Sequence, residues 1–188
     1  MPQYISIIAF LVLIMMVLCR VLMMKAHGLN AFVFGQTHRT DFTILPFVLF
    51  FVYHLLANTF DWPRISGPVF FDSEWLRWAG VLICILGLLL FLWGLISFGA
   101  SFRVGIDQSK PDKLMTHGAF AISRNPLYVA FIFFLVSFFF IFPNPLFLIC
   151  LFAGLWLFHR QIMREEIFLR KYYGEEYIDY CKKVRRYL

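Results

Sequence analysis

Two short polar segments interrupt an otherwise apolar chain and carry the residue types most able to bind a ligand. Residues 124–128 read Arg-Asn-Pro-Leu-Tyr, and Glu165 is followed directly by Glu166. An arginine can grip a carboxylate or a phosphate through two parallel hydrogen bonds, and a carboxylate can accept hydrogen bonds from ammonium or hydroxyl groups. Ionisable groups beside hydrocarbon are costly unless they have partners. The two segments are therefore predicted to form a functional site.

A third polar segment lies near the C-terminus, where residues 173–180 read Tyr-Gly-Glu-Glu-Tyr-Ile-Asp-Tyr. Gly174 predicts the end of one helix, and a short second helix after it would carry Tyr177 and Tyr180 on one face. Four basic residues surround that face. We expect this helix to lie at the membrane interface with its tyrosines turned toward the site, although a basic membrane anchor also explains the pattern.

The overall composition places these segments in an integral membrane protein. Mean hydropathy is +0.76, and 61% of the 188 residues are hydrophobic. Soluble domains are nearer half apolar. Several membrane helices leave no room for a separate soluble domain, so a single domain over residues 1–188 is predicted. Nucleic acid is not an expected partner, no metal-binding spacing is present, and the four cysteines are interpreted as free thiols.

Five apolar runs predict five membrane helices. They cover residues 4–24, 42–60, 76–98, 127–142 and 146–158. Only residues 143–145 separate the last two, which predicts an antiparallel helical hairpin. Asn125 and Asn144 each stand before a proline, so each is predicted to cap the helix that follows.

The third apolar run carries a stripe of glycines. Gly80, Gly87 and Gly94 are seven residues apart and so fall on one face of a helix. Small residues let a second helix approach closely within a membrane. We interpret this stripe as a packing feature rather than a chemical one.

Helix geometry brings the polar segments to one edge of the membrane. Going out from Pro126 to Pro143 covers about 26 Å and returning from Pro145 to Glu165 covers about 30 Å, at about 1.5 Å per residue. The two acids are therefore predicted to return level with Arg124. One of them should face the helix bundle and the other solvent, because neighbouring helical residues point about 100° apart.

The distribution of basic residues predicts the orientation. If the C-terminal tail is cytoplasmic, every lysine and arginine except Arg64 and Arg77 falls on the cytoplasmic side. Cytoplasmic segments carry the excess of positive charge, so the N-terminus is predicted outside and the C-terminus inside. The first apolar run is too long for a signal peptide and is expected to remain as a helix.

A stretch of 26 residues, 99–124, joins the third and fourth runs. Loops of this length are usually functional or disordered. Because it ends at Arg124, we expect it to cover a bound ligand. The alternative is a solvated basic linker at the headgroup surface.

The motifs resemble those of the isoprenylcysteine carboxyl methyltransferases and their prokaryotic relatives, which share a signature with the phospholipid N-methyltransferases. The resemblance rests on residues 116–120, 123–128, 165–166 and 173–177, with Tyr180. Asn125 departs from the eukaryotic carboxyl methyltransferases, which have histidine at that position.

This resemblance implies a multi-pass enzyme of a prokaryotic plasma membrane that binds S-adenosylmethionine near the cytoplasmic face. It divides the chain into a three-helix scaffold, residues 1–98, and a cofactor-binding and catalytic part, residues 99–188. It places Arg124 and Tyr177 at the methyl acceptor. The residues that it assigns to the cofactor are His117, Gly118, Asn125, Pro126, Tyr128, Glu165 and Glu166.

The acceptor implied by the resemblance is a lipid-like or prenylated molecule, reached from the surrounding membrane lipids. An isoprenylcysteine-like carboxylate is already a nucleophile and needs only Arg124 to hold it. A lipid amine must lose a proton, so Glu165 or Glu166 would have to act as base. Two other functions fit the same pattern: a nicotinamide-dependent enzyme resembling the sterol reductases, and a non-catalytic adaptor that binds anionic lipid through its basic tail.

Overall fold

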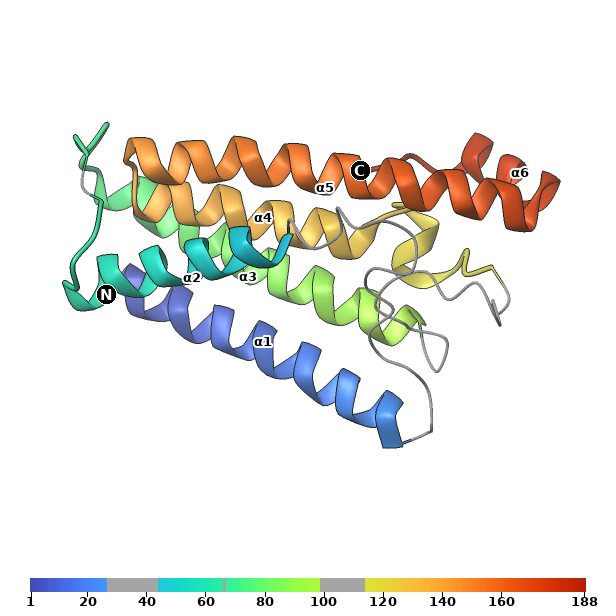
Figure 1. Ribbon diagram of the computed structural model, residues 1–188, viewed down its shortest axis with the longest axis horizontal. Coiled ribbons are helices and arrows are strands. Elements are labelled where there is room, and N and C mark those ends of the chain that lie inside the picture. The colour runs from blue at the N-terminus through green and yellow to red at the C-terminus, as the bar shows by residue number, and fades with distance from the viewer. Residues whose placement is uncertain (27–43, 66, 99–113) are drawn as a thin grey trace.

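The computed structural model describes residues 1–26, 44–65, 67–98 and 114–188, and within these ranges the chain is helical (Figure 1). Six α-helices and one 3-10 turn occur in the described part. They are α1 (Pro2–Ala26), α2 (Ile44–Phe60), α3 (Glu74–Phe98), η3 (Gly118–Ala121), α4 (Pro126–Ile141), α5 (Pro145–Tyr173) and α6 (Glu175–Lys183).

Five of these helices run alongside one another, and α6 folds back at one end of the bundle (Figure 1). The predicted hairpin of α4 and α5 is confirmed, and Asn144 caps α5 by accepting a hydrogen bond from the Phe147 amide at 3.1 Å. The Phe70 amide donates to the Pro143 carbonyl at 2.8 Å. The α2–α3 connection therefore lies beside the α4–α5 turn, at the end of the bundle opposite α6.

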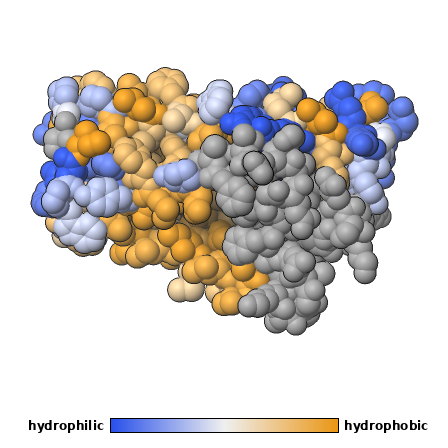
Figure 2. Space-filling view, viewed as in Figure 1, coloured by the Kyte–Doolittle hydropathy of each residue, from blue (hydrophilic) through white to orange (hydrophobic). Residues whose placement is uncertain are grey.

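Three helices, α1, α3 and α5, are long and apolar enough to cross a membrane, and α2 and α4 are shorter apolar helices. On the face seen in Figure 2, a broad hydrophobic band separates hydrophilic groups at the two ends of the molecule. This pattern agrees with the five apolar helices and short amphipathic tail helix that the sequence predicted.

The fifth helix is longer than its apolar run. The run was predicted to end at Phe158, but α5 continues to Tyr173. Residues 159–173 are rich in Arg, Gln, Met, Glu and Leu, which favour helix regardless of polarity. The helix ends only at Gly174, whose φ of 56° suits glycine best. As a result α5 carries both acids within a continuous helix.

The glycine stripe of α3 packs against α4, as predicted. A Cβ added to Gly80 would lie 2.9 Å from the Ser137 carbonyl oxygen, and one added to Gly94 would lie 2.6 Å from Leu127 Cδ2. The contact at Gly80 is with backbone, so only glycine allows this helix spacing there, whereas the contact at Gly94 is with the end of a side chain that can shift. Because Gly94 touches the first turn of α4, the stripe also fixes the position of Arg124 and Asn125.

Aromatic side chains fill the centre of the bundle. Phe10 of α1 and Phe51 of α2 both meet Phe138 of α4 edge-on, with ring centroids 5.7 and 5.5 Å apart. Phe51 also meets Phe147 of α5 at 5.8 Å. Edge-to-face pairs stabilise such a core beyond their buried area, so α4 and α5, which carry much of the site, have a rigid support.

Candidate active site

The start of α4 meets the second half of α5, as helix geometry predicted. Arg124 Nη2 donates a hydrogen bond to Glu166 Oε1 at 3.0 Å, and Asn125 Nδ2 approaches the same oxygen at 3.4 Å. Glu166 is only 6% exposed. A buried carboxylate requires a positive partner, and Arg124 is one of two that it has.

Arg186, beyond the end of α6, is the second partner. Its Nε donates to Glu166 Oε1 at 3.0 Å and its Nη2 donates to Oε2 at 2.9 Å. This contact with Glu166 raises the pKa of Arg186 above its usual value. The three side chains, Arg124, Glu166 and Arg186, form what we call the Arg-Glu-Arg cluster, which carries a net charge of one positive unit.

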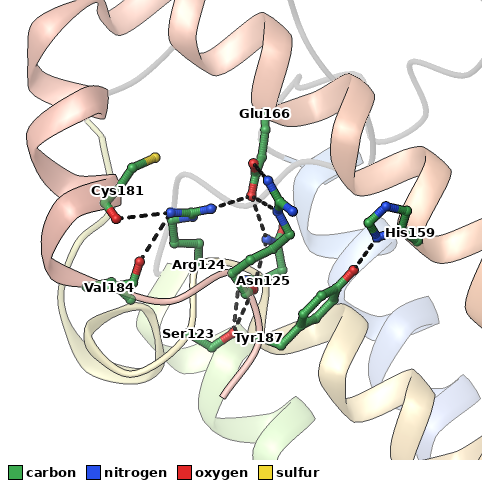
Figure 3. Close-up of polar contacts among 9 residues, drawn as sticks. Ser123, Arg124, Asn125, His159, Glu166, Cys181, Val184 and Tyr187 are labelled. Carbon is green, nitrogen blue, oxygen red and sulfur yellow. Dashed lines mark hydrogen bonds and ion pairs between the residues drawn. The ribbon is translucent and has the colours of Figure 1, made fainter.

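The last residues of α6 and the segment that follows it, residues 181–187, lie over the start of α4 (Figure 3); we call them the C-terminal strap. Their backbone carbonyls face Arg124. Arg124 Nη1 donates to the carbonyls of Cys181 and Val184, both at 3.2 Å, and its backbone amide donates to the Arg185 carbonyl at 2.9 Å. The strap thus joins the C-terminus of the chain to the candidate site.

Arg124, directly before α4, is enclosed by its neighbours. The side chain is only 10% exposed, because the C-terminal strap and Glu166 enclose it. Within the described residues its Nε is buried and has no hydrogen-bond partner. One donor of this enclosed arginine therefore remains available.

Asn125 does not cap α4, which corrects the prediction. Its side chain makes no capping hydrogen bond; Nδ2 instead donates to the Arg186 carbonyl at 3.1 Å. Its backbone amide donates to Ser123 Oγ at 3.1 Å. Tertiary contacts with the strap and Glu166 compete successfully for the amide, while Pro126 starts the helix as expected.

The other acid, Glu165, belongs to a neighbouring group of side chains. It accepts hydrogen bonds from the Tyr128 hydroxyl at 2.6 Å and from Gln161 Nε2 at 3.1 Å. The Tyr128 ring lies 6.0 Å from that of Phe158. Glu166 is buried and faces the bundle as predicted, but Glu165 is half-buried and also contacts α4 through Tyr128, so the expectation that the second acid faces solvent is not met.

The tyrosines of α6 turn into the protein, as expected. Tyr177 is 1% and Tyr180 6% exposed, and the Tyr180 hydroxyl donates to the Phe120 carbonyl at 2.6 Å. Burial raises the pKa of Tyr177, so its hydroxyl is neutral at physiological pH. The nearby Glu166 carboxylate raises the pKa of Tyr177 further. The short helix is therefore docked on the bundle through this face.

His117 and Gly118 lie at the η3 turn, against the end of α3. The Ala119 amide donates to Ser97 Oγ at 2.9 Å, and Gly118 has a φ of 60°, so the turn is fixed beside α3. His117 is exposed. In the described ranges no hydrogen bond joins either residue to the acids. The predicted ligand cover falls mainly on residues 99–113, outside the described residues.

The missed residues are those of the C-terminal strap. Arg186 had been counted only as one of four basic residues around α6, and no spacing distinguishes it from Lys182, Lys183 or Arg185. The Tyr187 hydroxyl of the strap lies 2.6 Å from Nδ1 of His159. That contact anchors the end of the strap on α5 (Figure 3).

The apolar helices define a multi-pass integral membrane protein, and the buried ionic cluster lies at one end of its helix bundle. The chain belongs to the phospholipid methyltransferase family, whose model matches residues 75–176, more than half of its length. The match includes α4, both acids and the start of α6.

Individual relatives carry more specific names. A protein-S-isoprenylcysteine O-methyltransferase of Tribolium castaneum is 28% identical over 139 residues, which cover 70% of this chain and 50% of the relative. The enzyme of that name from Rattus norvegicus is 29% identical over 163 residues, 85% of this chain and 54% of the relative. A probable one from Oryza sativa subsp. indica is 31% identical over 120 residues, 62% of this chain and 63% of the relative.

A solved structure agrees with these matches. A eukaryotic intramembrane Ras methyltransferase, isoprenylcysteine carboxyl methyltransferase, superposes with a TM-score of 0.58 at 28% identity, over 81% of this chain and 53% of that one. The chain spans about half the length of most of these relatives. The similarity includes the helical architecture described above.

Proposed function

We propose that this protein is an S-adenosylmethionine-dependent methyltransferase that esterifies the carboxylate of a lipophilic, isoprenylcysteine-like acceptor. Membership of a methyltransferase family supports the reaction class. The names of the similar proteins support a prenylated acceptor. Family membership also favours methyl transfer over the nicotinamide-dependent and adaptor functions.

The observation that carries the choice of a carboxylate is the Nε of Arg124, which has no hydrogen-bond partner among the described residues. A buried donor without a partner costs about 1–3 kcal/mol, and this one belongs to a side chain 10% exposed. It adjoins a cluster with net positive charge. An anionic acceptor would satisfy the donor and balance that charge, whereas an ammonium group would be repelled.

The residues present fit a cofactor that carries hydroxyl, carboxylate and ammonium groups. When bound, S-adenosylmethionine would supply a methyl group on a positively charged sulfur, for transfer to an aligned nucleophile with the neutral thioether as leaving group. Glu165 and Tyr128 offer acceptors and a ring wall for such a molecule. Glu166 is a less suitable ligand because arginines occupy both of its oxygens. We therefore assign Glu165 and Tyr128 to the cofactor, with His117, Gly118, Asn125 and Pro126 lining the same end of the bundle.

In this mechanism the protein's own contribution is alignment. In-line displacement requires reacting atoms about 3–3.5 Å apart and a site that excludes water. Arg124 would orient the acceptor carboxylate through Nε, and Tyr177, neutral and buried below it, would exclude water. No proton has to be removed from a carboxylate, so no general base is needed for this acceptor.

A lipid amine is the second candidate acceptor, because the matching family model is described as phospholipid methyltransferase. That reaction needs a base for the ammonium proton, and Glu165 is the acid placed to serve. The positive charge of the Arg-Glu-Arg cluster opposes it. The two acceptors can be compared directly.

The test uses purified protein in lipid nanodiscs with methyl-labelled S-adenosylmethionine. N-acetyl-S-farnesylcysteine supplies a prenylated carboxylate, and phosphatidylethanolamine supplies an amine. We expect a labelled methyl ester from the former, detected by mass spectrometry. Labelled amine instead would overturn the carboxylate assignment. A thermal shift with a nicotinamide cofactor but not with S-adenosylmethionine would overturn the reaction class.

The site end of the bundle is proposed to face the cytoplasm, from the distribution of basic residues. The resemblance to prokaryotic relatives supports a prokaryotic plasma membrane. Residues 1–98 would then form the scaffold and residues 99–188 the cofactor-binding and catalytic part. Labelling from outside the cell should modify a cysteine introduced near Gly67 and spare one appended after Leu188. The reverse pattern would invert this topology.

A further inference from the structure

Two arginines share Glu166 unequally. Arg186 uses Nε and Nη2, one whole edge of its guanidinium, to hold both carboxylate oxygens at 3.0 and 2.9 Å. Arg124 reaches the same carboxylate with Nη2 alone, at 3.0 Å. The Nε next to that Nη2 is the buried donor without a partner. Arg124 therefore stands one hydrogen bond short of the paired arrangement that Arg186 already has.

We propose that Arg186 is a positioning residue that keeps the Nε of Arg124 available for the acceptor. By holding both oxygens of Glu166, Arg186 prevents that carboxylate from closing onto the Nε–Nη2 edge of Arg124. This inference rests on the proposed function, in which that Nε orients the acceptor carboxylate.

The geometry shows why Arg124 would otherwise be captured. Paired hydrogen bonds between an arginine edge and a carboxylate are among the strongest in proteins. Without Arg186, Glu166 would be a buried carboxylate with one arginine partner and one oxygen free of arginine. A small rotation would then place Arg124 Nε on that oxygen. The captured arginine would have no donor left on that edge for a substrate.

The strap that presents Arg186 is anchored on η3 and α5 as well as on the start of α4. Tyr180 ties α6 to the η3 turn through the Phe120 carbonyl at 2.6 Å, and the Tyr187 hydroxyl lies 2.6 Å from His159 Nδ1 on α5. Arg186 lies between these anchors, and its own carbonyl accepts from Asn125 Nδ2 at 3.1 Å. The side chain is thereby held toward Glu166 even when Arg124 engages a substrate.

The test compares Arg186→Gln with Arg185→Gln, which removes an equal charge from an exposed side chain of the same strap. Turnover on N-acetyl-S-farnesylcysteine, S-adenosylmethionine affinity by calorimetry and the melting temperature are measured for each full-length variant. For Arg186→Gln we expect kcat/KM to fall about tenfold or more, the equivalent of one charge-assisted hydrogen bond. Cofactor affinity should change less than about threefold, which is less than the loss of one charge-assisted hydrogen bond would cause. Arg185→Gln should match the wild type.

The double variant Arg186→Gln with Glu166→Gln distinguishes positioning from simple structural support. A neutral amide has no charge with which to capture Arg124, so turnover should rise above that of Arg186→Gln alone. A structural role predicts losses that add. Unchanged turnover in Arg186→Gln, or additive losses in the double variant, would overturn the inference. An inactive wild type that fails to bind S-adenosylmethionine would instead refute the proposed function.

Arg186→Lys serves if Arg186→Gln does not fold. Lysine keeps the charge near Glu166 but cannot hold both oxygens through a planar edge. Its kcat/KM should lie between those of the wild type and the glutamine variant, with unchanged cofactor affinity. Turnover equal to the wild type would also overturn the inference.

Discussion

The two Asn-Pro helix starts share a dipeptide but have different structural roles. At the start of α5, the Asn144 side chain caps the helix through the Phe147 amide. At the start of α4, the Asn125 side chain leaves its helix uncapped and reaches Glu166 and the C-terminal strap. Helix capping fully explains the position of the Asn144 side chain but does not explain that of Asn125. The asparagine that does not cap its helix therefore lies at the end of the bundle where tertiary polar contacts dominate.

The ion pairs at the two ends differ in the same way. At the Asn144 end, Arg77 pairs with Asp72 at 2.7 Å, but these side chains are 36% and 82% exposed. At the Asn125 end, Arg124 and Glu166 are 10% and 8% exposed. Exposed pairs contribute little to stability, whereas breaking a buried pair leaves a charge without compensation. The same interaction should therefore matter very differently at the two ends.

The largest effect is expected from Glu166→Ala. It leaves Arg124 and Arg186 without their shared carboxylate and should reduce the free energy of unfolding by about 3–5 kcal/mol. Asp72→Ala is the matched control at the other end and should cost no more than about 1 kcal/mol. Denaturant unfolding in detergent measures both, and equal losses would remove the distinction between the two ends.

Arg124→Lys should rank next, through turnover rather than folding. Lysine retains the charge but loses the planar edge that orients a carboxylate, so kcat/KM should fall by roughly ten- to a hundredfold, or about 1.5–3 kcal/mol. Arg77→Lys, at the exposed pair, should leave turnover unchanged. Arg124→Ala should be at least as slow as Arg124→Lys on the prenylated carboxylate.

Two outcomes would contradict this placement of Arg124. If both variants turn over like the wild type, the guanidinium does not contact the acceptor. If both instead lose S-adenosylmethionine binding, Arg124 belongs to the cofactor side of the site. For an amine acceptor, the neutral variant should be tolerated at least as well as the lysine variant.

Glu165→Gln should weaken S-adenosylmethionine binding by about ten- to a hundredfold, the loss of one charge-assisted hydrogen bond. Glu166→Gln should affect stability more than cofactor affinity, because arginines already occupy that side chain. Isothermal calorimetry compares the two, with the exposed Glu176→Gln as control. An affinity loss confined to Glu166→Gln would exchange the assigned roles.

The smallest effects come from making one substitution at both helix starts. Asn144→Asp keeps a good cap and should change the free energy of unfolding by less than about 0.5 kcal/mol. Asn125→Asp removes the donor to the Arg186 carbonyl and adds a second carboxylate beside Glu166, at a cost of about 1–3 kcal/mol. Equal effects at the two positions would mean that Asn125 is an ordinary cap after all.

Much of the fold could be predicted from helical periodicity and from the helix-breaking residues in the sequence. Residues 143–145 required a hairpin, and the rise per helical residue then placed Glu166 level with Arg124. The spacing of Gly80, Gly87 and Gly94 identified the face of α3 that contacts α4. Each of these features depends only on regular helix geometry, which the sequence specifies well.

The details of the site depended on choices that periodicity does not describe. The Asn125 side chain could have capped the backbone amides of α4, but it instead contacts Glu166 and the strap, which are distant in sequence. Arg186 lies in an extended segment without a pattern, among basic neighbours of similar type. The partners of Arg124 are mostly backbone carbonyls of the strap, which any sequence provides. Such contacts become visible only in three dimensions.

The short length of α4 has a consequence for the membrane itself. Its 16 residues span about 24 Å at about 1.5 Å per residue, less than a typical hydrocarbon layer of roughly 30 Å. This hydrophobic mismatch must be relieved by thinning of the bilayer beside α4 or by water reaching down to the helix start. An acceptor anchored by an apolar chain would then meet Arg124 without leaving the lipid phase. The acyl-chain length of the surrounding lipids should therefore affect how readily such an acceptor reaches Arg124.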